Sequence, residues 1–137
     1  MDSNLVGRVL IPGNAAGPLF LLDSPISFWG GVDPHTGVIS DPRHPNHGRK
    51  ISGTVLGVPA TIGSSSSSAI MLELLRNGTA PAALLLGIHE CILVLGVIVA
   101  RELGYPTIPV IELAPAALAR LPADQPVSVT EQGSVLY

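Results

Sequence analysis

Hydrophobic residues occur along this chain in short runs separated by turn-forming residues, as is typical of an α/β domain. Continuous or alternating apolar runs predict strands at residues 5–11, 19–22, 51–58, 82–88, 107–113 and 127–130. Apolar positions with helical spacing predict helices at residues 69–77, 89–103 and 115–121. The run 82–88 is apolar throughout, which indicates a strand covered on both faces. The order strand, helix, strand from residue 82 to residue 113 predicts a parallel pair joined by a crossover helix.

Two segments between these elements contain residues that could bind a ligand or take part in catalysis. Residues 24–50 form a long loop rich in proline and glycine, and this loop holds Phe28 and Trp29. Because loops that carry large aromatic side chains normally dock them, we expect the loop to be ordered. The second segment is the run Ser64–Ser68, which follows Gly63 and leads into a predicted helix.

The composition bounds the size and the surface of the domain. With 137 residues the chain suffices for one domain, taken as residues 1–137, and is too short for two. Its hydrophobic fraction is 47% and its charged fraction is 12%, so it is not an intrinsically disordered chain. So few charges indicate either an unusually buried fold or a surface that another molecule covers.

The charge balance and the cysteine count exclude several classes of protein. A net charge of −3, from 7 basic and 10 acidic residues, gives no electrostatic basis for binding nucleic acid. The apolar region 80–100 contains His89 and Glu90, so it does not predict a membrane span, and no leader segment is evident. We therefore expect a cytoplasmic protein. The 1 cysteine, Cys91, excludes an internal disulfide and an iron–sulfur cluster held by this chain alone.

The serine run is the strongest candidate for chemistry. A flexible linker is one interpretation, but a linker placed between a strand and a helix would split the core. A glycine–serine turn that enters a helix instead presents backbone N–H groups at the positive end of the helix dipole. Gly63 allows a ligand to approach closely, and the serine hydroxyls can cap the helix or contact that ligand. The pattern therefore predicts a site for a carboxylate or a phosphate, although it is neither a Walker loop nor a GxSxG motif.

The segment Ser27–Pro34 (SFWGGVDP) is a second candidate. Gly30 and Gly31 free the backbone for a positive φ or for close contact with a ligand. The same residues also fit a well-packed turn anchored by Trp29. From the residues alone, both interpretations stay open.

Histidines and the cysteine allow further alternatives. The loop between the first strands contains a polar set that could ligate a metal, although its spacing matches no metal motif. This set is His35, His44, His47, Asp33 and Asp41. Cys91 beside His89 could form a thiol–base pair, but such a cysteine is more often a small buried hydrophobe. A stand-alone hydrolase with Ser64 as nucleophile would need a histidine within reach, and no triad motif is present.

Taken in order along the chain, these motifs resemble those of one protein family. The motifs are Ser27–Pro34, Thr36–Ile39, His44-Pro45, Gly48, Gly63–Ser65 and Ala80–Ala83. Their order and spacing are similar to those of the small subunit of aconitase X, over nearly the whole chain. The resemblance implies an α/β fold, a swivelling three-layer β/β/α domain like the C-terminal domain of aconitase. It also implies a large partner subunit that carries an iron–sulfur cluster.

The resemblance implies dehydration of a small hydroxy acid by a complex in which this chain alone is inactive. In aconitase-like enzymes a serine that follows a glycine on the swivel domain removes the α-proton. We therefore expect Ser64 to be the proton acceptor, with Ser65 as the runner-up because the serine run leaves the register open. The expected substrate contacts are Gly63, Ser65, Ser27, Trp29, Gly30 and Gly31, and no metal ligand is expected on this chain.

Two substrates are implied by the family, cis-3-hydroxy-L-proline and (R)-5-phosphomevalonate. Relatives often place a basic residue beside the Gly-Ser pair, whereas here the neighbours are Ile62 and serines. This departure disfavours phosphate recognition by the serine loop and leaves carboxylate recognition to the partner, so we favour the hydroxyproline reaction. The alternative is a binding protein rather than an enzyme: a module that binds a small anion through residues 63–68 without catalysis.

Overall fold

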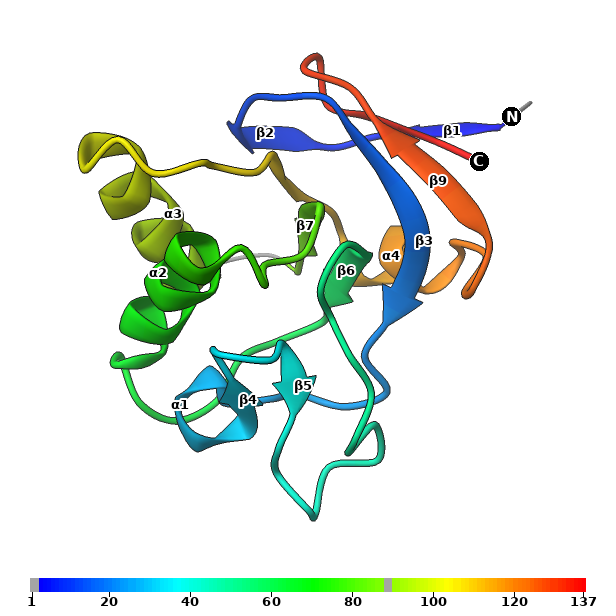
Figure 1. The fold of residues 1–137 in the computed structure, drawn as a ribbon. Coiled ribbons are helices and arrows are strands. Elements are labelled where there is room, and N and C mark those ends of the chain that lie inside the picture. Colours follow the sequence, from blue (N-terminus) through cyan, green and yellow to red (C-terminus); the bar gives the residue numbers. More distant parts are fainter. Residues whose placement is uncertain (1–2, 88–89) are drawn as a thin grey trace.

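The strands of this chain form one curved sheet, and helices α2 and α3 pack together over one of its faces (Figure 1). The structure is a computed structural model that describes residues 3–87 and 90–137. The strands of the main sheet are β1 (Asn4–Val6), β2 (Arg8–Ile11), β3 (Ala15–Leu21), β6 (Val55–Val58), β7 (Ala83–Leu86), β8 (Val110–Glu112), β9 (Pro126–Val129) and β10 (Ser134–Leu136). A separate hairpin consists of β4 (Val32–Asp33) and β5 (Val38–Ile39). The helices are α1 (Phe28–Gly31), α2 (Ser67–Asn77), α3 (Ile92–Glu102) and α4 (Pro115–Ala119).

The order of strands in the sheet is β1-β10-β9-β3-β6-β7-β8-β2. Strand β3 connects the antiparallel part of the sheet to the parallel part. Its residues 15–18 pair antiparallel with β9, and its residues 19–21 pair parallel with β6. The predicted parallel pair is confirmed as β7 and β8. The strand predicted at 5–11 is divided at Gly7: β1 pairs with β10, and β2 pairs with β8 at the other end of the order. The sheet therefore curls until its two edges meet at Gly7, whose N–H donates to Gly133 O at 2.9 Å.

Side chains on the two faces of the central strands fill two different cores. In β7, Leu84 and Leu86 pack toward α2 and α3, whereas Ala83 and Leu85 pack into the core that also contains β9, β10 and α4. Residues alternate between faces along a strand, so a strand buried on both sides must be apolar at every position. The continuous apolar run of β7 is thereby explained, and the mixed α/β class predicted from the sequence is confirmed.

The helices agree with the periodicity except at their ends. Helix α2 begins two residues earlier than predicted and ends where predicted, with Gly78 in the left-handed conformation at φ 73°. Helix α3 begins at Ile92 rather than at residue 89; His89 itself lies outside the described residues. No helix in the described ranges 3–87 and 90–137 is long and apolar enough to cross a membrane.

Other boundaries differ from the sequence prediction because pairing partners extend or shorten the strands. Strand β3 begins at Ala15, where β9 provides hydrogen bonds, and not at residue 19. Strand β6 is limited to four residues that pair with β3 and β7. The last strand, β10, was not predicted, and the long loop contains the β4–β5 hairpin and a single helical turn.

Candidate functional site

The serine run follows β6 and begins helix α2 with tight turns. The backbone N–H of Ser67 donates to Ser64 O at 3.1 Å, and that of Ser68 donates to Ser65 O at 3.2 Å. The Ser64 hydroxyl accepts the N–H of Ser66 at 3.0 Å, so this side chain caps the turn that leads into helix α2. The amides of Ser66, Ser67 and Ser68 are therefore already bonded within the chain. This corrects the expectation that the N–H groups after Gly63 are presented to a ligand; within the described part of the chain, only those of Ser64 and Ser65 have no hydrogen bond.

The Gly63 loop lies against the loop that carries the SFWGG motif. Ile26 N–H donates to Ala60 O at 3.3 Å, and Ile62 N–H donates back to Ile26 O at 3.1 Å. Gly63 has φ 87°, and a Cβ there would lie 3.0 Å from Ser27 Oγ. The structure thus brings together Ser27 and Gly63, two residues that the sequence separates widely, and a side chain at position 63 would be disfavoured by both backbone and space.

Ser67 provides a second connection between these loops. Its side chain is 1% exposed, and its hydroxyl accepts the backbone N–H of Trp29 at 3.0 Å. The carbonyl of Trp29 accepts the Ser27 hydroxyl at 3.1 Å, and Gly30 follows with φ 77°. The turn that carries the two glycines is therefore fixed to the start of α2. Ser67 could not be singled out from the sequence, because nothing in a uniform serine run distinguishes its members.

Trp29 is not docked as the sequence analysis expected. Its side chain is 57% exposed, whereas the neighbouring Phe28 is fully buried in the core beneath the hairpin. The backbone at Trp29 is not helical, with φ −67° and ψ 113°, and the side chains of successive residues in an extended segment point to opposite sides. The packed turn is confirmed, but Phe28 anchors it and Trp29 faces outward.

A surface hollow of about 560 Å³ lies beside these loops. One side is formed by residues of the SFWGG loop together with Ile62, and the other side by Asp41, Pro42 and Arg43. Of the expected contacts, Ser27, Trp29, Gly30 and Gly31 line the hollow. Arg43 is the one lysine or arginine among its lining residues, with Nε 3.7 Å from Asp41 Oδ1. The hollow therefore contains a cation from a later part of the long loop, which was not among the expected site residues. The signal in the sequence was a basic residue directly before the His44-Pro45 motif.

The histidine set does not converge on a common point. His44 is buried, and both ring nitrogens have hydrogen-bond partners, whereas His35 and His47 are exposed. Among the described residues, no group of three His, Cys, Asp or Glu side chains is placed to hold a metal ion. Cys91 is exposed, which corrects its expected burial, and it lines a largely apolar hollow of about 610 Å³ beside α3. The suggested pairing of Cys91 with His89 falls outside the described residues.

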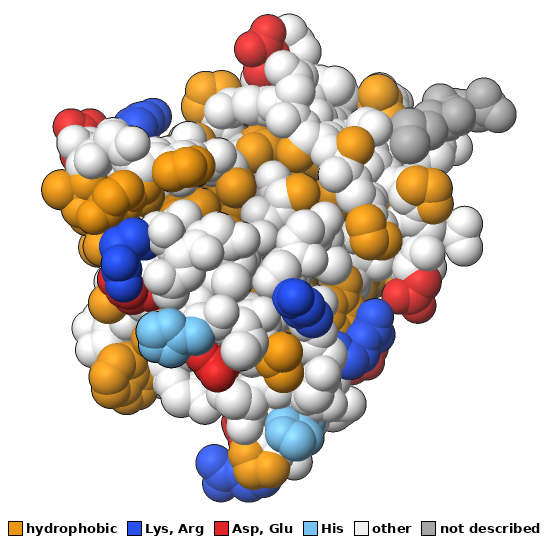
Figure 2. Space-filling view, viewed as in Figure 1, with side chains coloured by type: hydrophobic (Ala, Val, Ile, Leu, Met, Phe, Trp, Pro, Cys, Tyr) orange, Lys and Arg blue, Asp and Glu red, His pale blue; other side chains and the backbone are white. Residues whose placement is uncertain are grey.

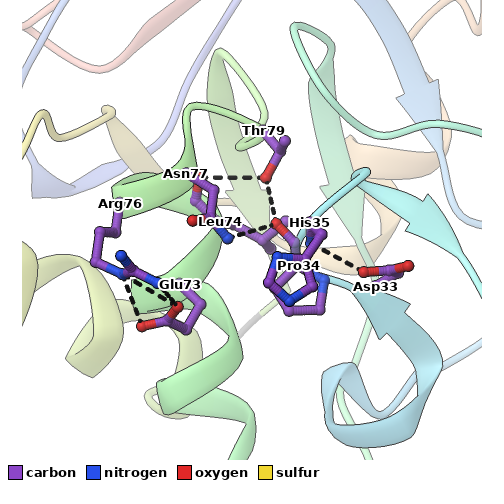
Figure 3. A network of polar contacts seen from close by, with 8 residues as sticks. All are labelled: Asp33, Pro34, His35, Glu73, Leu74, Arg76, Asn77 and Thr79. Atoms are coloured by element: carbon purple, nitrogen blue, oxygen red, sulfur yellow. Dashed lines mark hydrogen bonds and ion pairs between the residues drawn. The ribbon is translucent and has the colours of Figure 1, made fainter.

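The β4–β5 hairpin is fixed to the end of α2 by a network of polar contacts (Figure 3). Pro34 O accepts Asn77 Nδ2 at 3.0 Å and Thr79 Oγ1 at 2.6 Å. On the same helix the hydrogen-bonded guanidinium of Arg76 lowers the pKa of the exposed Glu73 carboxyl. Both ends of α2 thus hold the long loop: Ser67 binds Trp29 at the start, and Asn77 binds the hairpin at the end.

The fold and the site define a small α/β domain that presents a glycine–serine loop at the beginning of a helix. The family model described as the aconitase X swivel domain matches residues 4–137. The chain belongs to this family.

Individual relatives fall into two kinds. A cis-3-hydroxy-L-proline dehydratase of Hypocrea jecorina is 41% identical over 128 residues, which make up 93% of this chain and 22% of that protein. A phosphomevalonate dehydratase small subunit of Thermococcus onnurineus is 36% identical over 128 residues, which make up 93% of this chain and 98% of that protein. The chain thus spans about a fifth of the length of the hydroxyproline dehydratases that it matches.

A solved structure has the same fold. The crystal structure of Thermococcus kodakaraensis aconitase X in its holo-form superposes with a TM-score of 0.86 at 31% identity. The match covers 98% of this chain and 97% of that chain. The resemblance to aconitase X inferred from the sequence is confirmed.

Proposed function

We propose that this chain is the small subunit of an aconitase-like hydro-lyase that dehydrates a small hydroxy acid, cis-3-hydroxy-L-proline. Membership of the aconitase X swivel-domain family carries the proposal, because the relatives matched are named as dehydratases or dehydratase subunits. The names that contain "small subunit" support a second, larger chain as the partner. The complex is assigned to the cytoplasm, and the isolated chain is expected to be inactive.

Ser64 is the proposed base. As an alkoxide, its Oγ takes the proton from the carbon next to the carboxylate, and the electrons of that C–H bond form a C=C bond. The C–O bond to the hydroxyl group breaks, and the hydroxide takes a proton from solvent and departs as water. A serine hydroxyl is a poor base, and its alkoxide forms only where nearby donors stabilise the negative charge. The Ser66 N–H, 3.0 Å from Ser64 Oγ, is one such donor. Ser65, whose side chain is exposed, is the weaker candidate.

The residues of this chain do not fit an iron–sulfur cluster. Its single cysteine is exposed, and no metal-ligand group occurs among the described residues. We therefore assign the cluster to the large partner, where it would act as a Lewis acid on the leaving hydroxyl. The part of this chain is to provide the base and one wall of the substrate site.

The substrate assignment rests on identity over the same length of chain. Across 128 residues the identity is 41% to the hydroxyproline dehydratase and 36% to the phosphomevalonate dehydratase small subunit. The hollow contributes one cation, Arg43, and one guanidinium suits a single carboxylate. A second candidate, the small subunit of phosphomevalonate dehydratase, is favoured by the match along 98% of such a subunit.

Reconstitution with the large partner tests this function. The two chains would be purified separately, mixed anaerobically with iron and sulfide, and assayed for loss of cis-3-hydroxy-L-proline and of 5-phosphomevalonate. We expect turnover of hydroxyproline by the mixture and by neither chain alone. Turnover of phosphomevalonate only would select the second candidate. A cluster-loaded complex that dehydrates neither compound would contradict the proposal and favour a module that binds an anion without catalysis.

A further inference from the structure

One wall of the hollow, residues 41–43, is attached at both ends to the loop that forms the opposite wall. At its beginning, Ser40 N–H donates to Gly31 O at 2.9 Å and Ser40 Oγ donates to Gly30 O at 3.3 Å. At its end, His44 Nε2 lies 3.1 Å from Ser24 O. The histidine contact is therefore one of the attachments that set the distance between the two walls, and it is the one made next to Arg43.

His44 makes this contact as a specific tautomer. The ring is buried, with 7% exposure, and Nδ1 accepts the backbone N–H of Asn46 at 3.0 Å. Nδ1 must therefore carry a lone pair, so the neutral ring has its proton on Nε2 and donates it to Ser24 O. Asn46, also buried, adds to the attachment by accepting Asp23 N–H at 2.9 Å and donating to the Asp23 carboxylate at 2.7 Å.

Arg43 directly precedes this attachment and is available for a ligand. Its side chain is 92% exposed, and its Nε lies 3.7 Å from Asp41 Oδ1, beyond the range of a strong charge-assisted hydrogen bond. The backbone N–H of Arg43 donates to the same carboxylate at 2.9 Å, which orients the turn. A guanidinium whose backbone is fixed and whose one ion pair, with Asp41, is long and exposed is suited to bidentate binding of a carboxylate.

We propose that His44 is a positioning residue that holds Arg43 at the hollow, where the guanidinium binds the acid group of the substrate. This inference rests on the proposed function, because the acid group belongs to the hydroxy acid. His44 does not touch the substrate and takes no part in proton transfer. It acts by keeping the wall that carries Arg43 at a fixed distance from Ser27 and the glycine turn.

The tautomer can be tested without any measurement of activity. Nitrogen-15 NMR of the histidine rings of the full chain at pH 7, assigned with His44→Gln, should show His44 as the neutral Nε2–H form. A His44 ring that carries its proton on Nδ1, or on both nitrogens, would overturn the attachment. This result does not depend on whether the complex dehydrates either compound, so its failure is distinguishable from failure of the proposed function.

Steady-state kinetics of the reconstituted complex test the role. Arg43→Ala should raise KM about tenfold or more while kcat changes by less than about threefold, as for loss of a charge-assisted contact made equally in the ground and transition states. His44→Ala should give the same pattern. His44→Gln, whose amide can still donate toward Ser24 O, should recover most of the loss. His47→Ala, an exposed histidine of the same loop, is the matched control and should be unchanged.

A double variant separates positioning from general destabilisation. If His44 acts through Arg43, the KM of the His44→Ala/Arg43→Ala complex should equal that of Arg43→Ala alone. Effects that multiply, or a fall in kcat with KM unchanged, would overturn the proposal. Should His44→Ala not fold, His44→Leu, which keeps the buried volume but has no donor for Ser24 O, replaces it in both comparisons.

Discussion

Ser64 combines a structural and a proposed chemical role in one hydroxyl. Its Oγ accepts the Ser66 N–H at 3.0 Å, which caps the turn that leads into α2 and also provides a donor for negative charge on that oxygen. The two roles are compatible, because the donor that fixes the neutral hydroxyl stabilises the alkoxide more strongly. They differ in what removal of the oxygen does: loss of a cap lowers stability slightly, whereas loss of a base stops the reaction.

Ser64→Ala should therefore separate activity from stability. General-base catalysis contributes about 10²- to 10⁴-fold, so kcat of the reconstituted complex should fall by at least about 100-fold. Loss of the cap should cost about 1 kcal/mol, measured as the free energy of unfolding of the chain. Ser65→Ala is the matched control and should leave kcat within about threefold of wild type. A large loss in Ser65→Ala with normal turnover in Ser64→Ala would move the base by one position.

Ser67 is the serine whose removal should most affect the loop. Ser67→Ala leaves the Trp29 N–H without the acceptor that it has at 3.0 Å, in a part-buried position. An unsatisfied buried donor costs about 1–3 kcal/mol, which should appear as a lower midpoint in chemical denaturation. Ser66→Ala is the control, because the Ser66 side chain is exposed and makes no capping hydrogen bond. Equal stability of the two variants would show that the Trp29 contact contributes nothing.

At the scale of elements, α2 and α3 pack closely because α3 has a glycine where they cross. A Cβ at Gly96 would lie 2.5 Å from Ser68 O and 2.8 Å from Met71 Cβ. The first of these atoms belongs to the backbone at the beginning of α2, which cannot move without moving the serine loop. The separation of the two helices thus helps to set the position of the candidate site.

Gly96→Ala should destabilise the chain although alanine favours helices. Overpacking costs about 1–3 kcal/mol, which exceeds the gain of about 1 kcal/mol in helix propensity. Thermal unfolding followed by circular dichroism would measure the change. Arg101→Ala, at an exposed position of the same helix, should change stability by less than about 0.5 kcal/mol. A Gly96→Ala chain as stable as wild type would mean that α2 and α3 can separate at little cost.

Elements whose signal is local were predictable from the sequence, and those fixed by distant partners were not. Helix α2, its end at Gly78 and strand β7 each follow from periodicity, a cap residue or a continuous apolar run. The division of the first strand at Gly7 depends on β8 and β10, more than a hundred residues away. The same holds for the site: Gly63 and Ser27 were identified individually, but only the fold places them side by side. Only the fold places Arg43 in one hollow with Ser27, and neither Gly63 nor Ser65 is among the residues that line that hollow.

At the scale of the whole molecule, the low charge of the sequence has a counterpart on the surface. Only 12% of the residues are charged, and in the face shown in Figure 2 charged side chains are few and scattered while hydrophobic ones gather over α3. Five large hydrophobic side chains are exposed among the described residues: Val6, Trp29, Ile62, Leu95 and Leu103. Two of them, Trp29 and Ile62, line the hollow that Ser27 and Arg43 also line. Since obligate interfaces resemble a core cut in half, we expect these two to contact the large partner.

Substitution of Trp29 and Ile62 by serine should weaken assembly more than it weakens the fold. Both backbones are held by hydrogen bonds, at 3.0 Å from Trp29 N to Ser67 Oγ and at 3.1 Å from Ile62 N to Ile26 O, so the positions from which the two side chains project are fixed. Tryptophan is a typical hot-spot residue, whose loss costs about 2 kcal/mol or more, or about 30-fold in Kd, and loss of the smaller Ile62 side chain should cost less. Isothermal titration of the large partner with each variant would measure this loss.

The control for assembly is Leu103→Ser, at an equally exposed residue that ends α3 and does not line the hollow. If the interface is centred on the hollow, Leu103→Ser should bind the large partner with wild-type affinity, while Trp29→Ser and Ile62→Ser bind weakly. The opposite ranking would place the interface on α3 and leave the hollow open to solvent in the complex. Because the proposed base Ser64 and the cation Arg43 lie on the loops that carry Ile62 and Trp29, an interface there would close the proposed site with the partner's surface. The low fraction of charged residues would then be explained by an apolar surface that the partner covers, at a site that is complete only in the complex of two chains.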